Sequence, residues 1–346
     1  MRRELPAATL AAGVGIVLVL LIWAGSRGLA DFDSALIGYA VGTVVAATGI
    51  TYRYALWISR PPTWRYFRAG WREFLSWRNF RRYATLVPRA WWTDILAQTF
   101  LLRRGAVRWA AHMAIFWGVV LSCAITFPLT FGWLRFTLVP PEAYQLWFFG
   151  VPLLRFPLGG AFAFLAFHAL DLTALLLLAG LAVALWRRTT EEGFLATQRF
   201  GFDLVPLVLL VAVALTGLAL TASSLFWEGR FYWFISLTHQ VVVVAWLVSL
   251  PFGKFFHIVE RPATIGINLY QTVNRDPAHE GGAVCARCGR ALPSRRFVED
   301  VKATLEDLGQ HYALGAGRGV LQDYCPTCKR VLRGEAYYAL LGRRFL

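Results

Sequence analysis

The chain has few charged residues, and carboxylates are especially scarce. Only 16% of its 346 residues are charged, and 20 Asp and Glu stand against 35 Lys and Arg, whereas 57% are hydrophobic. A soluble core cannot bury that much apolar surface, but a lipid bilayer requires it. The composition therefore excludes an ordinary soluble protein. The arginines mostly flank apolar runs, where they serve as topology and lipid-headgroup anchors, so the net charge of +15 does not predict a nucleic-acid partner.

Cysteine is also scarce, and its distribution excludes a disulfide framework. Of the five cysteines, four form two CxxC pairs in a polar tail, and Cys123 lies alone inside an apolar run. Paired CxxC motifs of this kind suit a metal site in a reducing compartment better than disulfides. We interpret Cys123 as a small buried hydrophobe.

Apolar runs long enough to cross a bilayer predict a bundle of about six transmembrane helices. The first run ends in a small-residue stretch that could pass for a signal peptide cleaved after Ala30. We interpret it instead as an additional first membrane helix within 1–30. The sequence contains no internal repeat and no low-complexity tract. The six runs are 7–24, 35–56, 106–134, 159–186, 203–223 and 231–256.

Loops rich in arginine and lysine alternate along the chain with loops that are poor in them, and this alternation predicts the topology. The segment 57–105 and the tail are basic, so the positive-inside rule predicts that both termini are cytoplasmic. In 57–105, Trp64, Trp71 and Trp77 alternate with arginines at helical spacing. Such a segment is expected to lie among lipid headgroups, and a docking surface for a cytoplasmic partner is the alternative. Residues 138–156 are expected to cap the outer surface.

Four histidines fall in or beside the apolar runs, where imidazoles are costly and usually functional. One such histidine could simply bond to a neighbouring helix, but these four sort by depth into an inner pair, His112 with His257, and an outer pair, His168 with His239. On one continuous helix, His239 and His257 would be five turns and about 27 Å apart on the same face. Two bis-histidine pairs across a membrane suit two b-type haems. A proton relay would need more carboxylates than Asp171.

The same residues resemble a known family. The stretch from His239 to His257, followed by IVERP, resembles the last helix of the cytochrome b (gamma) subunit of respiratory nitrate reductase and of heterodisulfide reductase-type membrane cytochromes. RRGAVRWAAHMAIFWG around His112, and ALWRR followed by FDLVPLVLL, are similar to earlier helices of that family. The likeness covers roughly residues 35–270, and we assign 31–270 to this domain.

The resemblance implies specific cofactors and partners. It implies an inner haem b on His112 and His257, with electrons exchanged between membrane quinone or quinol and a cytoplasmic iron–sulfur catalytic subunit in a hetero-oligomeric complex. The family has a second histidine where this chain has Ser122, which cannot ligate iron. We expect His168 to replace it opposite His239; otherwise the protein holds one haem.

The polar tail, 271–346, predicts a zinc-ribbon-like metal site. Two CxxC turns present four thiolates, Cys285, Cys288, Cys325 and Cys328, which complete a tetrahedral site. Zinc is the expected metal, with rubredoxin-like iron or an iron–sulfur cluster as alternatives. Ala291 stands where a ferredoxin motif has its third cysteine, which argues against a conventional [4Fe–4S] cluster. His279 and His311 are expected to be solvated.

The sequence thus predicts an all-α integral membrane bundle with a small cytoplasmic four-cysteine domain. The function that these patterns favour is a haem b-containing subunit of a respiratory electron-transport complex, a quinol oxidoreductase active only within that complex. The alternative is a non-redox membrane anchor whose zinc ribbon recruits cytoplasmic proteins. A transporter is disfavoured because repeats and midplane carboxylates are absent from the sequence.

Overall fold

The computed structural model describes residues 4–77, 81, 84–272, 282–315 and 317–342. The chain forms two compact units: residues 1–56 with 96–258, and residues 57–95 with 259–346. This division differs from the predicted one, because much of the arginine-rich segment 57–105 groups with the cysteine-containing tail.

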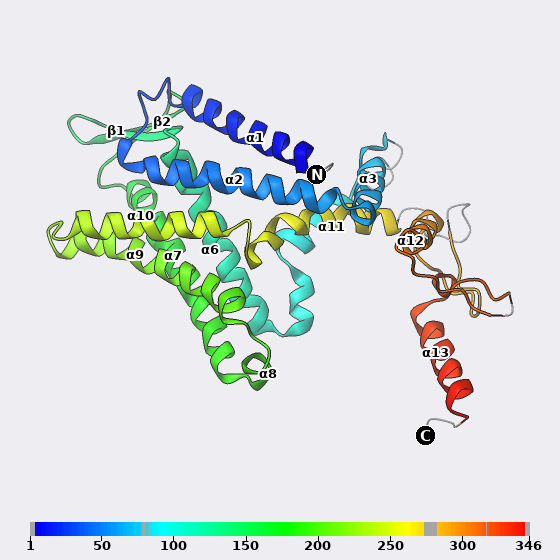
Figure 1. The fold of residues 1–346 in the computed structure, drawn as a ribbon. Coiled ribbons are helices and arrows are strands. Elements are labelled where there is room, and N and C mark those ends of the chain that lie inside the picture. The colour runs from blue at the N-terminus through cyan, green and yellow to red at the C-terminus, as the bar shows by residue number, and fades with distance from the viewer. Residues whose placement is uncertain (1–3, 78–80, 82–83, 273–281, 316, 343–346) are drawn as a thin grey trace. The chain divides into compact units, whose positions relative to one another are not determined.

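Six helices of the described chain are long and apolar enough to cross a membrane, in agreement with the six predicted runs (Figure 1). Short 3₁₀ and π turns precede α2 and α9, at Ser34–Leu36 and Phe200–Leu204. Six such helices are compatible with a multi-pass membrane protein. The helices are α1 (Glu4–Gly25), α2 (Ile37–Ile58), α6 (Ala106–Thr130), α7 (Ala161–Thr190), α9 (Val205–Phe226) and α10 (Tyr232–Ser249).

A small antiparallel sheet joins α6 to α7, so the prediction of an all-α fold needs correction. Its strands, in the order β1-β2-β3, are Leu134–Val139, Ala143–Phe148 and Val151–Pro157. The sheet packs onto α7 through aromatic rings: Phe167 lies 5.3 Å from Phe136 and 4.9 Å from Tyr144, measured between ring centroids. Aromatic and β-branched residues favour strands, and strands of six or seven residues are too short to span a bilayer.

Glycines let the membrane helices approach one another closely. A Cβ atom at Gly42 of α2 would lie 3.3 Å from the Leu247 side chain of α10, and one at Gly118 of α6 would lie 2.8 Å from Leu177 of α7. In a bilayer, helices associate by close packing at small residues rather than by the hydrophobic effect. The interior between these helices is formed by Leu177, Leu181, Leu210 and Leu247.

The last predicted span, 231–256, is shorter in the structure. Helix α10 ends at Ser249, a 3₁₀ turn follows at Lys254–Phe256, and α11 (His257–Thr272) begins at the histidine itself. Proline has no N–H and disfavours helical backbone before it, so Pro251 interrupts the helix. The guanidinium of Arg53 donates to the Pro251 carbonyl and stabilises this break. His239 and His257 therefore do not lie on one continuous helix, and the five-turn argument does not apply to them.

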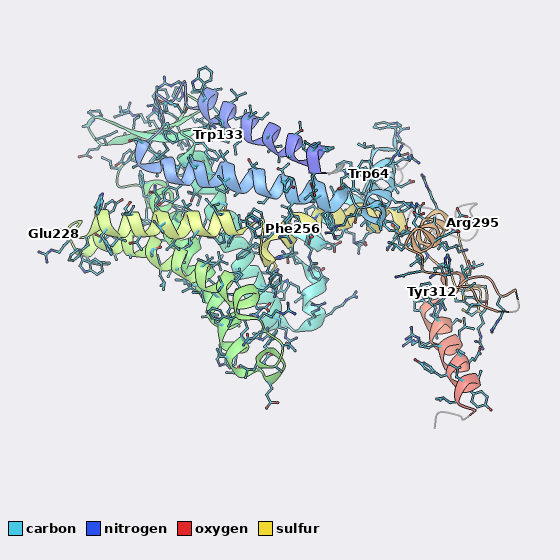
Figure 2. All side chains as sticks on the ribbon, in the orientation of Figure 1. Trp64, Trp133, Glu228, Phe256, Arg295 and Tyr312 are labelled. Atoms are coloured by element: carbon cyan, nitrogen blue, oxygen red, sulfur yellow. The ribbon has the colours of Figure 1, made fainter. Side chains whose placement is uncertain are left out.

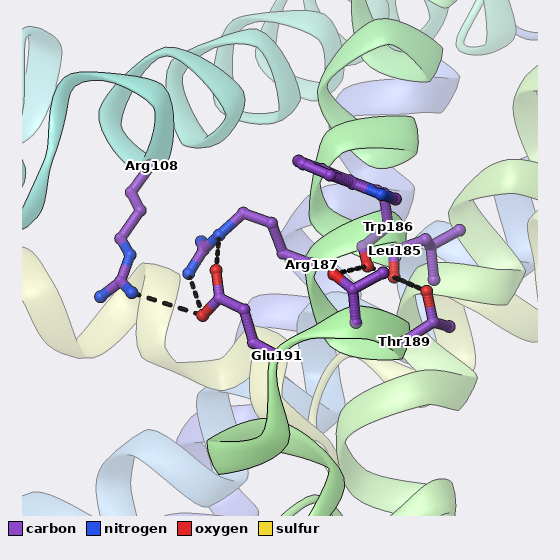
Figure 3. Close-up of polar contacts among 7 residues, drawn as sticks. Arg108, Leu185, Trp186, Arg187, Thr189 and Glu191 are labelled. Carbon is purple, nitrogen blue, oxygen red and sulfur yellow. Dashed lines mark hydrogen bonds and ion pairs between the residues drawn. The ribbon is translucent and has the colours of Figure 1, made fainter.

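The first unit, residues 1–56 with 96–258, is called the membrane unit because it holds the six long apolar helices. Its remaining elements are short and lie between these helices. They include a 3₁₀ segment at Thr99–Arg104 and α8 (Glu192–Leu195). The end of α7 is tied to α6 by Glu191, which accepts from Arg187 at 2.7 Å and contacts Arg108 at 3.4 Å (Figure 3). The hydrogen bond from Arg187 is the main reason why the pKa of Glu191 lies below its usual value.

The second unit consists of helices around a seam of aromatic rings. At this seam, Phe297 contacts Tyr66 and Tyr270 at centroid distances of 5.6 and 5.7 Å. The predicted Trp-rich helix exists as α3 and contains Trp64 and Trp71, while residues 78–80 and 82–83 of that segment lie outside the described residues. Besides most of α11, its described helices are α3 (Pro61–Leu75), α5 (Leu86–Ala90), α12 (Arg295–Asp307) and α13 (Pro326–Leu341), with a π-helical turn at Trp91–Leu96 and a 3₁₀ turn at Leu321–Asp323.

A buried ion pair holds the loop between α1 and α2 against the sheet. The Asp31 carboxylate, whose side chain is 2% exposed, accepts from Arg27 at 2.6 Å and lies 3.2 Å from Arg135 of β1. Nearby, Trp133, which is labelled in Figure 2, donates from its indole N–H to the Leu21 carbonyl of α1. The hydrogen bond from Arg27 is the main cause that lowers the pKa of Asp31.

We expect Asp31→Asn to destabilise the membrane unit by about 1–3 kcal/mol, because it leaves the arginines without their buried partner. Since the folded-state pKa of Asp31 is depressed, its contribution is fully present above the unfolded pKa and is lost as pH falls through the folded pKa. Thermal unfolding in detergent at pH 7 and pH 3 measures both effects. Asp33→Asn is the matched control, because an amide oxygen can still accept from the Ala35 N–H. Equal melting temperatures for the two variants would contradict the prediction.

Candidate functional site

The four predicted cysteines come together in the second unit. Their sulfur atoms all lie within 4.8 Å of one another, and the structure places Cys285, Cys325 and Cys328 in buried positions and Cys288 in an exposed one. A tetrahedral site with metal–sulfur bonds of about 2.3 Å requires sulfur atoms about 3.8 Å apart. The Cys288 and Cys325 sulfurs are 3.7 Å apart. The cluster therefore has the spacing to bind one metal ion.

Each CxxC turn is built by local backbone contacts. In the first, the Gly289 N–H donates to the Cys285 carbonyl at 3.0 Å, and Gly289 has a φ of +69°, which glycine adopts without strain. In the second, Cys325 precedes α13, and its sulfur accepts from the Cys328 N–H. The Cys325 N–H in turn donates to the Cys285 sulfur at 3.2 Å. The two turns are thus joined by a direct hydrogen bond that needs no metal.

The backbone around the cluster favours thiolate at Cys285. Burial alone would raise the pKa of this thiol, but N–H groups of Cys325, Cys288 and Arg287 donate to its sulfur and lower the pKa to about 6. Burial and the neighbouring sulfurs raise the pKa of Cys328 to about 12. Thiolate is the metal-binding form, so a cation shared by the four sulfurs would remove the penalty at Cys328. His311 is exposed, and His279 lies outside the described residues.

A second candidate site is a cavity inside the membrane unit. Its volume is about 400 Å³, and residues of α2, α6, α7, α9 and α10 line it. Its lining is mostly apolar, with His239 and Asp171 among the few ionisable groups. Among the described residues, the lining includes His239 but not His112, His168 or His257. Cofactor pockets have this size and this mostly apolar character.

The Thr216 hydroxyl of α9 contacts His239. It lies 2.6 Å from the Ala212 carbonyl and 2.8 Å from the His239 Nδ1 atom, an arrangement in which the hydroxyl donates to the carbonyl and accepts from Nδ1. The Nε2 atom of His239 is then unprotonated. A histidine that binds a metal usually has this pattern, with one nitrogen donating to the protein and the other free.

A close helix contact and an unpartnered polar atom lie beside His239. A Cβ atom at Gly217 would lie 3.3 Å from the imidazole Cε1 atom, so glycine lets the ring pack closely against α9. Trp246, which also lines the cavity, is 7% exposed, and its buried indole N–H has no acceptor among the described residues. Buried donors normally have a partner, so an acceptor on a bound molecule would satisfy it.

His168 is linked to the cavity through Asp171. Its Nδ1 atom lies 2.9 Å from one Asp171 oxygen, and the other oxygen accepts from Thr221 of α9 at 2.7 Å. Because a carboxylate accepts, His168 donates from Nδ1 and its Nε2 atom is free. His168 and His239 each lie seven residues after the first residue of α7 and α10, Ala161 and Tyr232. At about 1.5 Å per residue, both are about 10 Å from the same side of the bundle.

The inner pair is on the other side. His112 is half-buried, six residues after Ala106, the first residue of α6. His257 is half-buried at the start of α11, and its Nδ1 atom lies 2.5 Å from the Lys254 carbonyl. A carbonyl can only accept, so the Nε2 atom of His257 is free as well. The predicted pairing of these histidines by iron stays a prediction.

Ser122 is where the resembling family has a histidine, and it too lines the cavity. Its hydroxyl is 2.8 Å from that of Thr173 on α7, and the lone Cys123 is beside it in the lining.

Several residues of the cavity escaped the sequence reasoning. Thr216, Thr221 and Trp246 gave no signal, because their roles depend on the neighbouring helix. Gly217 lies within the LTG motif of the resemblance, which could have indicated close packing there. No family model, no curated protein and no solved structure matches this chain.

Proposed function

We propose that this chain is a haem b-containing membrane subunit of a respiratory oxidoreductase complex. It would transfer electrons between membrane quinone or quinol and a cytoplasmic iron–sulfur or catalytic partner. One observation is the main support: His168, His239 and His257 each use Nδ1 for a bond to the protein and keep Nε2 available. Axial haem ligands need that free nitrogen.

The cavity supports the proposal of a haem on the His239 side. Its volume of about 400 Å³ and the unsatisfied Trp246 N–H are both suited to a cofactor with polar edge groups. The lining contains no second imidazole among the described residues, so we propose that His168 supplies it, as its free Nε2 atom permits. Haem, when bound, supplies one-electron chemistry, and the protein positions it and adjusts its polarity.

We propose the inner haem between His112 and His257. The Lys254 carbonyl holds the His257 ring in the ligating tautomer. The Lys254 ammonium also contacts Asp203 at 2.5 Å, which stabilises the turn that presents His257. With an outer and an inner level, electrons could cross the bilayer in two steps.

The four-cysteine cluster is proposed as a zinc site, with iron as the alternative. A four-thiolate zinc site is structural and closed, so it would stabilise the tail rather than react. We propose that the tail and both termini face the cytoplasm and that the tail contributes to the surface for the catalytic partner. The proposed membrane is the inner membrane of a bacterium or archaeon.

An absorption spectrum tests this function. Chain purified from cells with sufficient haem should show b-type Soret and α bands in the reduced-minus-oxidised difference. Quinol added to the oxidised protein should reduce part of the haem, so that the reduced α band appears at part of its full height. A spectrum without these bands would contradict the haem proposal.

The cysteine cluster favours a second candidate, a non-redox membrane anchor whose metal ribbon recruits cytoplasmic proteins. It differs from the first in one measurable respect, because it predicts metal in the tail without haem in the membrane unit. Elemental analysis and the same spectrum, made on one preparation, separate the two candidates.

A further inference from the structure

Four arginines surround a small hollow in the second unit. The hollow has a volume of about 180 Å³ and lies between α3, which contributes Arg65, Arg68 and Arg72, and α12, which contributes Arg296. One carboxylate, Asp300, also lines it. The lining therefore has a clear excess of positive charge.

The packing of the two helices holds Arg65 in place. Arg65 donates to the Thr304 hydroxyl at 2.8 Å and to Asp307 at 2.7 Å, both on α12. The rings of Tyr66 and Phe297 close the seam beneath the hollow. Gly70 lets α3 approach α11, because a Cβ there would lie 2.9 Å from the Gly266 carbonyl.

Two of the four guanidinium groups have no counter-charge of their own. Arg65 is paired with Asp307, and Arg296 contacts Glu73 at 3.3 Å. Arg68 and Arg72 are exposed, and within the described part of the chain no side chain bonds to either of them. Arginine forks match the oxygens of phosphate, so an unpaired pair of arginines on a concave surface favours a phosphate ligand.

The neighbouring face of α3 indicates where that phosphate comes from. Trp64, Phe67 and Trp71 stack along the helix, and both tryptophans are about half exposed, at 49% and 47%. At 100° per residue these rings share one face, and Arg65, Arg68 and Arg72 share the adjacent face. Helix α3 begins at Pro61, three residues after membrane helix α2 ends at Ile58. An amphipathic helix so close to a span lies at the interface, with its rings at the acyl boundary and its arginines at phosphate depth.

We propose that this hollow binds the phosphate of an anionic phospholipid, such as phosphatidylglycerol, through Arg68 and Arg72 with Arg296. Because Arg296 belongs to α12, the lipid would connect the membrane-proximal helix to the cysteine-containing segment. This binding is independent of haem and of electron transfer.

The test is lipid binding by the purified full chain. Brominated phosphatidylglycerol in phosphatidylcholine nanodiscs should quench tryptophan fluorescence, and titration should give an affinity about 25-fold weaker for the double variant Arg68→Gln/Arg72→Gln, about fivefold for each arginine. Arg68→Lys should show an intermediate loss, since lysine keeps the charge without the fork. Arg330→Gln/Arg333→Gln, which removes two exposed arginines of α13 that flank no apolar run, is the matched control and should bind like the wild type.

Equal affinities of the double variant and its control would overturn the proposal, as would equal quenching by brominated phosphatidylcholine alone. Inorganic phosphate at equal ionic strength should compete only weakly. If inorganic phosphate prevents the quenching by brominated phosphatidylglycerol as well as excess unbrominated lipid does, the ligand is free phosphate and the lipid assignment fails. Metal content of the four-cysteine cluster, unchanged in the double variant, shows that the unit has folded.

Discussion

Cys325→Ser should remove the metal from the tail. The wild-type chain is expected to retain about one metal ion, and the variant should bind it more than about 100-fold more weakly, because loss of a direct ligand exceeds the cost of losing a supporting contact. Cys325 is 1% exposed, and its sulfur lies 3.7 Å from that of Cys288. Elemental analysis of the purified chain measures metal per protein and shows whether the metal is zinc or iron.

Two features make this variant informative. Serine can still cap α13, as the Cys325 sulfur does towards the Cys328 N–H, so the helix start is preserved and the metal is the main loss. Cys123→Ser is the matched control, because this cysteine lies in the membrane unit and outside the cluster. Equal metal retention in both variants, or a wild-type chain without bound metal, would show that the sulfurs cluster for another reason.

His257→Ala should eliminate the inner haem, and His239→Ala the outer one. Each change removes an axial nitrogen from a proposed bis-histidine pair, so each should remove about half of the haem if two are bound. His168→Ala should match His239→Ala in the haem-to-protein ratio, because the two residues are proposed to bind one iron. The ratio is measured by the pyridine haemochrome assay on purified chain.

The control for the histidine series is His311→Ala, which changes an exposed histidine of the tail. It should keep the full haem content. A His168→Ala variant with wild-type haem would leave only the inner site. A His257→Ala variant with wild-type haem would contradict the inner site itself. Thr216→Val is a finer probe, because it removes the side-chain contact to His239 Nδ1. It should lower the affinity of the outer site for haem about 10–100-fold.

The membrane helices could be predicted from the sequence because their signal is local. An apolar run of about 20 residues can satisfy its own backbone in lipid only as a helix, whatever its neighbours are. The ends were less predictable where local and tertiary effects compete. Helix α10 stops at Ser249, before Pro251, although apolar residues continue to Phe256. The strands at 134–157 were missed because their hydrogen bonds pair residues from separate strands.

The four-cysteine cluster was also predictable. Each CxxC turn brings two sulfurs together locally, so a single contact between the two turns completes the cluster. The sequence predicts a depth for each histidine, because position along a helix is a property of sequence, but it does not predict how each helix is rotated towards its neighbours. Asp171, rather than His168, lines the cavity with His239, and Thr216 contacts the Nδ1 atom of that ring.

The sequence by itself predicted six long apolar helices, their approximate bounds and the four sulfurs that cluster, all of which follow from composition and spacing along one chain. The tertiary structure alone decided the cavity beside His239, the contact of its Nδ1 atom with Thr216 and the arginine hollow between α3 and α12. Those features depend on side chains from helices far apart in the sequence, and their contacts exist only once the helices have packed.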